Sequence, residues 1–300
     1  MGIAIPQVIT DRSGAQVIDG SLKFGGSQNL KYVPGNAGNT KTWTWSGWVK
    51  RTKFSTLQGI FSARDGATGL TLQFGEYNTT QDYLVVYNSV VSGNYVVKTS
   101  NQLRDTGWYH IVLLFDTTQA TASDRLKIYI NGSEASYGTD NRSNLTQNSA
   151  ARVNEAMNSH YVGSTVNADE YTHAYMSQVY FIDGQGIGPE YFGFTDPLTN
   201  TWKPKKYSGT FTNKNSWYLP FDGNTPIGRD QAYFASAYQA WTPQNFGGSV
   251  ELDKATGAKP ILNTTQGGTV AAPGVFGSRE NVGYAVTVYN DGGGNKYYID

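Results

Sequence analysis

The chain of 300 residues carries 23 basic and 23 acidic residues, and charged residues make up only 15% of it. This balance argues against a nucleic-acid partner, because proteins that bind nucleic acids usually carry a clustered basic surface. The absence of cysteine excludes disulfides, thiolate metal sites and a cysteine nucleophile, and no apolar run is long enough to predict membrane insertion.

Short segments of alternating apolar and polar residues, separated by turn residues, follow one another along most of the chain. They lie at 21–24, 42–50, 60–63, 70–74, 83–87, 95–98, 108–115, 125–130, 160–163, 174–181 and 216–221. Helical periodicity is nearly absent, with brief candidates only at 189–194 and 231–239. This pattern predicts an all-β protein, a two-sheet antiparallel sandwich rather than a parallel α/β sheet.

One of these segments is apolar enough to be buried on both faces of a sheet, and another carries three tryptophans. Segment 42–50 (TWTWSGWVK) places Trp43 and Trp45 on one face and Trp48 on the other. Segment 108–115 (WYHIVLLF) is the most apolar run and is expected to form a central strand.

Turn residues give two further expectations. Segment 125–130 ends in Asn131-Gly132, the strongest short hairpin signal, because both residues tolerate positive φ. In segment 216–221, Pro220 cannot donate a ladder hydrogen bond, so this strand is expected at an edge or ending there.

Three regions are expected: an extended N-terminal arm at 1–20, a sandwich at 21–245, and a linker with a small β-hairpin at 246–300. The C-terminal hairpin would pair 284–289 with 296–299 across a glycine-rich loop. The arm is apolar around Pro6 and has two interpretations: it joins the edge of its own sheet, or it is an attachment interface. The candidate interface residues are Ile3, Ile5, Val8 and Ile9.

Five of the segments, in this order, resemble the laminin-G-like, concanavalin A-like jelly-roll superfamily. They read SLKFG at 21–25, WTWSGWVK at 43–50, DTGWYHIV at 105–112, LKIYING at 126–132 and YMSQVYFIDGQGI at 175–187. The resemblance implies a concanavalin A-like jelly roll from about residue 21 to about residue 221.

A closer resemblance is to virion structural and tail-fibre-like proteins of marine bacteriophages. It rests on GSLKF at 20–24, KTWTWSGWVKR at 41–51, WYLPFDGNTPIG at 217–228 and WTPQN at 241–245. It implies a phage virion protein exposed on the particle surface, as a capsid decoration, head-fibre or tail-fibre module. The implied partners are major capsid or tail proteins and further copies of the chain in a homo-oligomer. No signal peptide is visible at the N-terminus, which fits release inside a particle.

Catalysis is not expected. Glycoside hydrolases of the superfamily carry an E-x-D-x-x-E strand, and its nearest counterpart here is Glu251, Asp253 and Thr256, where threonine replaces the last carboxylate. The pair Asp169-Glu170 reads as a solvated loop. The histidines are His110, His160 and His173, and their spacing matches neither a metal site nor a nucleophile motif. A structural role is expected for His110.

No cofactor is predicted. Relatives in the superfamily bind Ca²⁺ through loop oxygens, and Asp65, Asp116 and Asp183 stand at expected strand ends. No cluster resembles a Ca²⁺ loop, and each residue suits an ordinary turn, so no metal ligand is assigned.

The alternative function is a lectin-like module that binds host-surface polysaccharide during adsorption. Lectins stack sugars on exposed aromatic rings and hold hydroxyls with amide side chains. Pairs of suitable residues occur, although aromatic residues in a sandwich usually belong to the core. The pairs are Tyr77 with Asn78, Tyr87 with Asn88, and Trp202 with Tyr207.

Overall fold

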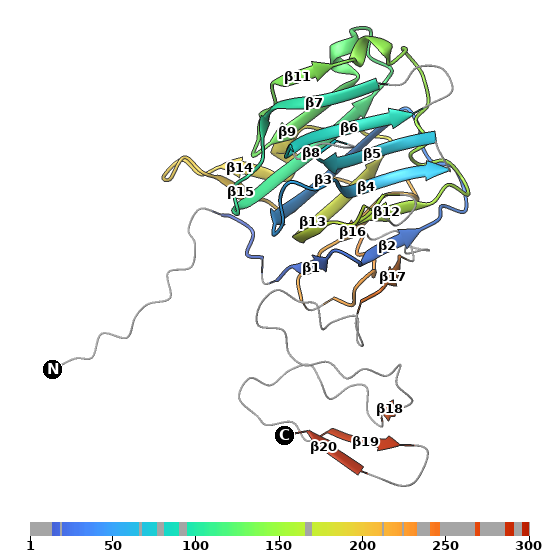
Figure 1. Ribbon diagram of the computed structural model, residues 1–300, viewed down its shortest axis with the longest axis vertical. Coiled ribbons are helices and arrows are strands. Elements are labelled where there is room, and N and C mark those ends of the chain that lie inside the picture. The colour runs from blue at the N-terminus through green and yellow to red at the C-terminus, as the bar shows by residue number, and fades with distance from the viewer. Residues whose placement is uncertain are drawn as a thin grey trace, which may run out of the picture.

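The computed structural model describes residues 14–18, 20–65, 68–76, 81–89, 95–165, 170–211, 213–223, 225–232 and 241–246, together with three short strands near the C-terminus. Two large antiparallel sheets lie face to face (Figure 1). The all-β, two-sheet jelly-roll sandwich predicted from the sequence is therefore confirmed. No helix in the described part of the chain is long and apolar enough to cross a membrane.

The seven-stranded sheet has the order β1-β13-β3-β8-β9-β10, and β16 also pairs with β13. Its strands are β1 (Leu22–Gly25), β3 (Thr42–Arg51), β8 (Trp108–Asp116), β9 (Leu126–Ile130), β10 (Ser133–Glu134), β13 (His173–Asp183) and β16 (Trp217–Leu219). Strand β8 lies in the middle of the sheet, as its apolar sequence predicts, and β3 is its neighbour there.

The eight-stranded sheet has the order β11-β7-β6-β5-β4-β12-β2-β17. Its strands are β2 (Asn29–Tyr32), β4 (Gln58–Asp65), β5 (Thr68–Phe74), β6 (Tyr83–Ser89), β7 (Tyr95–Gln102), β11 (Tyr137–Asp140), β12 (His160–Val162) and β17 (Thr242–Gln244). No strand was predicted at β17 because this segment contains Pro243, which an edge position tolerates.

The remaining elements are small. A ribbon of β14 (Gly193–Thr195) and β15 (Trp202–Pro204) projects from the sandwich (Figure 1). The 3-10 helices are η1 (Ala122–Asp124), η2 (Arg142–Asn144) and η3 (Pro189–Tyr191), the last lying in the expected 189–194 segment. The expected C-terminal hairpin is present as β19 (Val286–Asn290) paired with β20 (Lys296–Ile299). A third strand, β18 (Gly268–Val270), pairs with the other edge of β19. Most of the expected 231–239 helix, and Ile3, Ile5, Val8 and Ile9, lie outside the described residues.

The core between the sheets is built on aromatic stacking. Trp43 and Trp45 of β3 point into it and are fully buried, while Trp48 lies on the opposite face, as predicted. Trp43 stacks on Phe115 with ring centroids 4.8 Å apart, and Trp45 stacks on Phe61 of the other sheet at 6.3 Å. Burial of each such side chain contributes about 1.5–3 kcal/mol.

The outer face of the seven-stranded sheet is also partly covered. The chain on either side of β16 passes over this face and contributes to a second cluster, in which Val112, Tyr180 and Ile182 of β8 and β13 are buried together with Tyr218 of β16. The covering residues include Phe192, Tyr207 and Ala232. A sheet face this apolar has to be shielded from water, which explains why the chain continues past β13 across the sheet.

A bulge in β13 shapes this face. The register of β13 shifts between Ser177 and Tyr180, where Gln178 has a φ of 51° and its N–H donates to the Pro220 carbonyl. Strands β1 and β16 pair with β13 on either side of this bulge. Among the described strands β16 pairs with β13 alone, which confirms the edge position predicted from Pro220.

The predicted hairpin at Asn131-Gly132 is confirmed. Asn131 has a φ of 48° and Gly132 a φ of 84°, as a two-residue type I′ turn requires. The Asn131 side-chain oxygen accepts a hydrogen bond from the His110 backbone N–H at 2.8 Å. Gly132 is required for a second reason, since a β-carbon there would lie 2.3 Å from the Trp202 ring.

A buried ion pair joins β3 to the loops of the other sheet. Arg51 donates to the Asp82 carboxylate at 2.7 Å and to the Leu103 carbonyl at 2.6 Å, and its guanidinium lies 4.2 Å from the Phe74 ring centroid. Burial alone would raise the pKa of Asp82, but the hydrogen bond from the Ser55 N–H and the pairing with Arg51 outweigh it and hold the pKa below its ordinary value.

Asp82→Ala is expected to lower the free energy of unfolding by about 3–5 kcal/mol, because it leaves the Arg51 charge buried without a counterion. Urea unfolding at neutral pH measures the loss. The matched control is Glu155→Ala, which breaks the half-exposed pair with Arg152 and should cost less than about 1 kcal/mol. Equal losses in the two variants would contradict the assignment.

Candidate functional site

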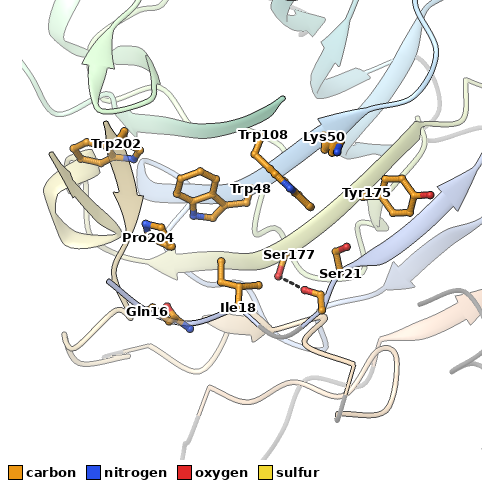
Figure 2. Close-up of a pocket in the computed structure, with 11 residues that line it drawn as sticks. Gln16, Ile18, Ser21, Trp48, Lys50, Trp108, Tyr175, Ser177, Trp202 and Pro204 are labelled. Carbon is orange, nitrogen blue, oxygen red and sulfur yellow. Dashed lines mark hydrogen bonds between the residues drawn. The ribbon is translucent and has the colours of Figure 1, made fainter. Parts of the chain in front are cut away.

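An open groove of about 540 Å³ lies on the outer face of the seven-stranded sheet (Figure 2). It occupies the part of that face beside the second cluster. Aromatic side chains dominate its lining, with a few polar groups among them. The lining residues are Gln16, Ile18, Gly20, Ser21, Trp48, Lys50, Trp108, Tyr175, Ser177, Trp202 and Pro204.

Strand register brings the central groove residues together. Tyr175 of β13 is opposite Lys50 of β3, which is opposite Trp108 of β8. The next row on the same face runs from Ser177 through Trp48 to His110. Directly opposed residues of an antiparallel sheet project from the same face. Tyr175, Lys50, Trp108, Ser177 and Trp48, which come from three distant segments, therefore form the floor of the groove. His110 lies in the same row as Trp48, beneath the aromatic rings of the groove.

Three rings stack at one end of the groove. The His110 ring lies between Trp48, at a centroid distance of 5.0 Å, and Trp202, at 5.9 Å, with interplanar angles of 29° and 21°. The Trp202 indole N–H donates to His110 Nδ1 at 3.0 Å. Because an indole nitrogen only donates, Nδ1 is the acceptor and Nε2 carries the hydrogen, which it donates to Ser46 Oγ at 2.9 Å.

His110 is neutral in the folded protein. It is 1% exposed, and burial lowers its pKa to about 3. Both ring nitrogens already have partners within the stack. The imidazole therefore holds Trp48 and Trp202 in place, in agreement with the structural role expected for this histidine.

The opposite wall of the groove is fixed by backbone contacts of the N-terminal segment. The Gln16 N–H donates to the Pro204 carbonyl of β15 at 2.9 Å, and its side-chain amide donates to Gln178 Oε1 at 2.9 Å. Ser177 Oγ donates to the Gly20 carbonyl at 3.0 Å, as Figure 2 shows. These bonds hold the segment that carries Ile18 against the sheet.

The exposed surface of the groove is aromatic and free of acid groups. Trp108 is 38% exposed, and Tyr175, Lys50 and Trp202 are half-buried. Among the described lining residues none is Asp or Glu. The arrangement can pack a flat ligand face against rings and hydrogen bond its edges, but the described lining offers no carboxylate pair for acid–base hydrolysis.

The structure separates most of the sugar-binding candidates proposed from sequence. Trp202 lines the groove, whereas Tyr207 is buried in the second cluster. On β6, Tyr87 is half-buried and Asn88 is buried, away from the groove lining. Tyr77 and Asn78 lie outside the described residues. Sequence reasoning missed Trp48, Trp108 and Tyr175 as residues that line a groove. The one signal for them was that large apolar side chains alternate onto both faces of their strands.

The aspartates considered for Ca²⁺ have ordinary partners where they are described. Asp116 accepts hydrogen bonds from Thr42 and Thr118, as a turn aspartate does. Asp183 accepts from the Asn39 N–H and the Asn154 amide, and burial nevertheless raises its pKa. The Asp65 side chain is outside the described set. No group of three metal-ligating side chains occurs within the described residues.

Most of the residues considered for hydrolysis cannot be placed relative to the groove, because Glu251, Asp253, Thr256 and Asp169 lie outside the described residues. Glu170 is described and does not line the groove. It is half-buried, and its backbone carbonyl accepts a hydrogen bond from the Gly59 N–H of β4.

Comparison with known proteins identifies the family. The model of the Laminin_G_3 family, described as the concanavalin A-like lectin/glucanases superfamily, matches residues 24–185, which is more than half of the chain. The chain therefore belongs to this family. No curated protein matches the sequence.

Several solved structures are similar. A candidate carbohydrate-binding protein of Bacteroides ovatus aligns with a TM-score of 0.50 and 17% identity, over 76% of this chain and 60% of that protein. Domain 4 of an extracellular arabinanase from Geobacillus stearothermophilus, in complex with arabinotriose, gives 0.42 and 20%, over 57% and 73% of the two chains. Tailspike protein 2 of an Escherichia coli bacteriophage gives 0.39 and 11%, over 60% and 28%. The likeness to the Bacteroides ovatus protein concerns the fold alone.

Lowering the pH should destabilise the protein through His110. The unfolded chain binds a proton on this histidine below pH about 6.5, whereas the folded state does not until about pH 3. The contribution of His110 to the free energy of unfolding is therefore fully present above about pH 6.5. As the pH falls below that value, the free energy of unfolding decreases by about 1.4 kcal/mol per pH unit for one such histidine. Urea unfolding between about pH 6.5 and 4.5 measures this dependence. In His110→Phe about one proton fewer should be taken up on unfolding, so the free energy of unfolding should depend less steeply on pH. The buried His160 should account for part of the dependence that remains. An unchanged slope would show that His110 is protonated in the folded state.

Proposed function

We propose that the groove on the outer face of the seven-stranded sheet binds a carbohydrate chain. The observation that carries the proposal is that the exposed ring of Trp108 shares one groove with Tyr175 and Trp202, in a concave site whose described lining has no carboxylate. A lone exposed aromatic residue is common on protein surfaces, but several in one groove are typical of a binding site.

The chemistry of sugars fits this lining. One face of a pyranose ring presents C–H groups that pack on an aromatic ring, and its edge presents hydroxyls that need polar partners. Lys50, Ser21 and Gln16 stand among the rings and can supply donors and acceptors.

The groove is also prepared for binding. Trp48 and Trp202 are held by the His110 stack, and the segment with Gln16 is held by its bonds to Pro204 and Gln178. Side chains that are already ordered lose little conformational entropy when a ligand arrives. The shared fold of the candidate carbohydrate-binding protein of Bacteroides ovatus supports the proposal at the level of architecture.

We propose binding without hydrolysis. Retaining and inverting glycosidases need two carboxyl groups about 5–9.5 Å apart across the scissile bond. The described groove lining contains lysine, serine, glutamine and aromatic residues in place of such a pair.

We further propose that the domain is carried on the surface of a bacteriophage particle, bound to capsid or tail proteins and to other copies of itself. The support is the phage-like sequence at 20–24, 41–51, 217–228 and 241–245, which frames both ends of the sandwich. A glycan-binding module in that location would help the particle adsorb to host-surface polysaccharide.

Trp108→Ala should weaken polysaccharide binding about tenfold, since loss of one aromatic platform removes on the order of 1 kcal/mol or more. Affinity electrophoresis in gels containing arabinan, xylan, alginate or polygalacturonate measures retardation of the folded protein. Tyr191→Ala, which removes a 45%-exposed ring that does not line the groove, should leave retardation unchanged. Equal behaviour of the two variants, or no retardation of the wild type by any of these polymers, would contradict the proposal.

The virion location has its own test. Mass spectrometry and antibody labelling of purified particles from the phage that encodes the chain should detect it on the surface, and the isolated protein should sediment as an oligomer. A monomer that is absent from purified particles would exclude this location without affecting the groove.

A further inference from the structure

Two lysines stand in one row with the exposed rings of the groove. Lys23 of β1 is opposite Tyr175 of β13, Tyr175 is opposite Lys50 of β3, and Lys50 is opposite Trp108 of β8. Because directly opposed residues project from one face, lysine and aromatic side chains alternate along this row across four strands. The two lysine positions are two strand spacings apart, about 10 Å.

Neither ammonium group has a counterion in the described part of the chain. Elsewhere the lysines near carboxylates form ion pairs: Lys98 with Glu76, Lys127 with Asp124 and Lys203 with Asp196. Lys23 and Lys50 form none among the described residues, and the described groove lining has no carboxylate to offer. The row is thus a local excess of positive charge on a chain whose formal net charge is zero.

We propose that the ligand of the groove is an acidic polysaccharide, whose carboxylate or sulfate groups pair with Lys50 and Lys23 while its sugar faces pack on Trp108 and Tyr175. This inference rests on the carbohydrate-binding function proposed above. A repeat of cation and ring matches a polymer in which charged groups recur along a chain of flat sugar faces.

The environment of Lys50 strengthens such a pair. Its side chain is half-buried between the positions of two aromatic residues, so the ammonium is less surrounded by water than one on an open surface. Reduced solvent screening increases the attraction between opposite charges. A lysine ammonium is a compact charge on a flexible stem, which can meet either a carboxylate or a sulfate.

The test compares matched polymers that differ in charge. Polygalacturonate is paired with its methyl-esterified form, in which the carboxylates are neutral, and carrageenan is paired with agarose, which lacks most of the sulfate. Titration calorimetry of the full chain should show binding to at least one acidic polymer about tenfold tighter than to its neutral counterpart, as expected for charge-assisted hydrogen bonds. The pair that shows the difference identifies carboxylate or sulfate as the recognised group.

Lys50→Gln should reduce binding to the acidic polymer about tenfold and binding to the neutral one much less, because it removes the charge and keeps a polar side chain that can still donate to sugar hydroxyls. Lys23→Gln, at an exposed position, should have a smaller effect of the same kind. The control is Lys41→Gln, which removes one exposed charge that does not line the groove and should change neither affinity. Raising NaCl from about 0.1 M to about 1 M shortens the Debye length from about 10 Å to about 3 Å. This change should weaken binding of the acidic polymer and leave binding of the neutral polymer unaffected.

The outcomes separate the two proposals. Equal affinity for charged and neutral polymers, with Trp108→Ala weakening both, would overturn the acidic ligand and leave carbohydrate binding standing. Equal losses in Lys50→Gln and Lys41→Gln would also overturn it, since attraction would then be non-specific. Binding to polyglutamate as tight as to the acidic polysaccharides, or binding to no polysaccharide of either charge, would overturn carbohydrate binding itself.

Discussion

The hydrogen bond from the Trp202 indole to His110 Nδ1 joins the β14–β15 ribbon to the seven-stranded sheet. His110 is buried, so this nitrogen would cost about 1–3 kcal/mol if it were left without a donor. The same ring also stacks on Trp48 and reaches Ser46 through its other nitrogen. One neutral imidazole thereby fixes two indoles, and the rigidity of the groove wall depends on it.

The groove itself follows from incomplete shielding of an apolar sheet. Part of the outer face is covered by the chain around β16, where Phe192 and Tyr207 pack on Tyr180. The rest carries its own large side chains, and the ribbon and the N-terminal segment form walls around them (Figure 2). A cover that ends part-way across the sheet leaves an aromatic groove where a complete cover would make core. Its side chains are held in place in the free protein, and such ordering favours the ligand binding that we propose.

Local sequence signals predicted what depends on local geometry. The alternation in β3 placed Trp43 and Trp48 on opposite faces, and Asn131-Gly132 predicted its hairpin because the turn needs positive φ at both residues. The groove was not predictable in this way, since it depends on pairing among β3, β8 and β13, which are far apart in the chain. Tyr207 shows the same limit, because whether an aromatic residue is exposed depends on which segment covers it.

The most direct test of sugar binding in the groove is a titration of ¹⁵N-labelled indole signals with an oligogalacturonate, and with a neutral arabinan oligosaccharide if the acidic one does not bind. Binding at the groove predicts that the Trp108 N–H signal moves most, while those of the core residues Trp43 and Trp45 stay in place. Trp241 packs on Tyr32 of the eight-stranded sheet, so its N–H signal reports on a region away from the groove. A saturable shift of Trp241 with a stationary Trp108 would place the sugar elsewhere and contradict the groove as the binding site.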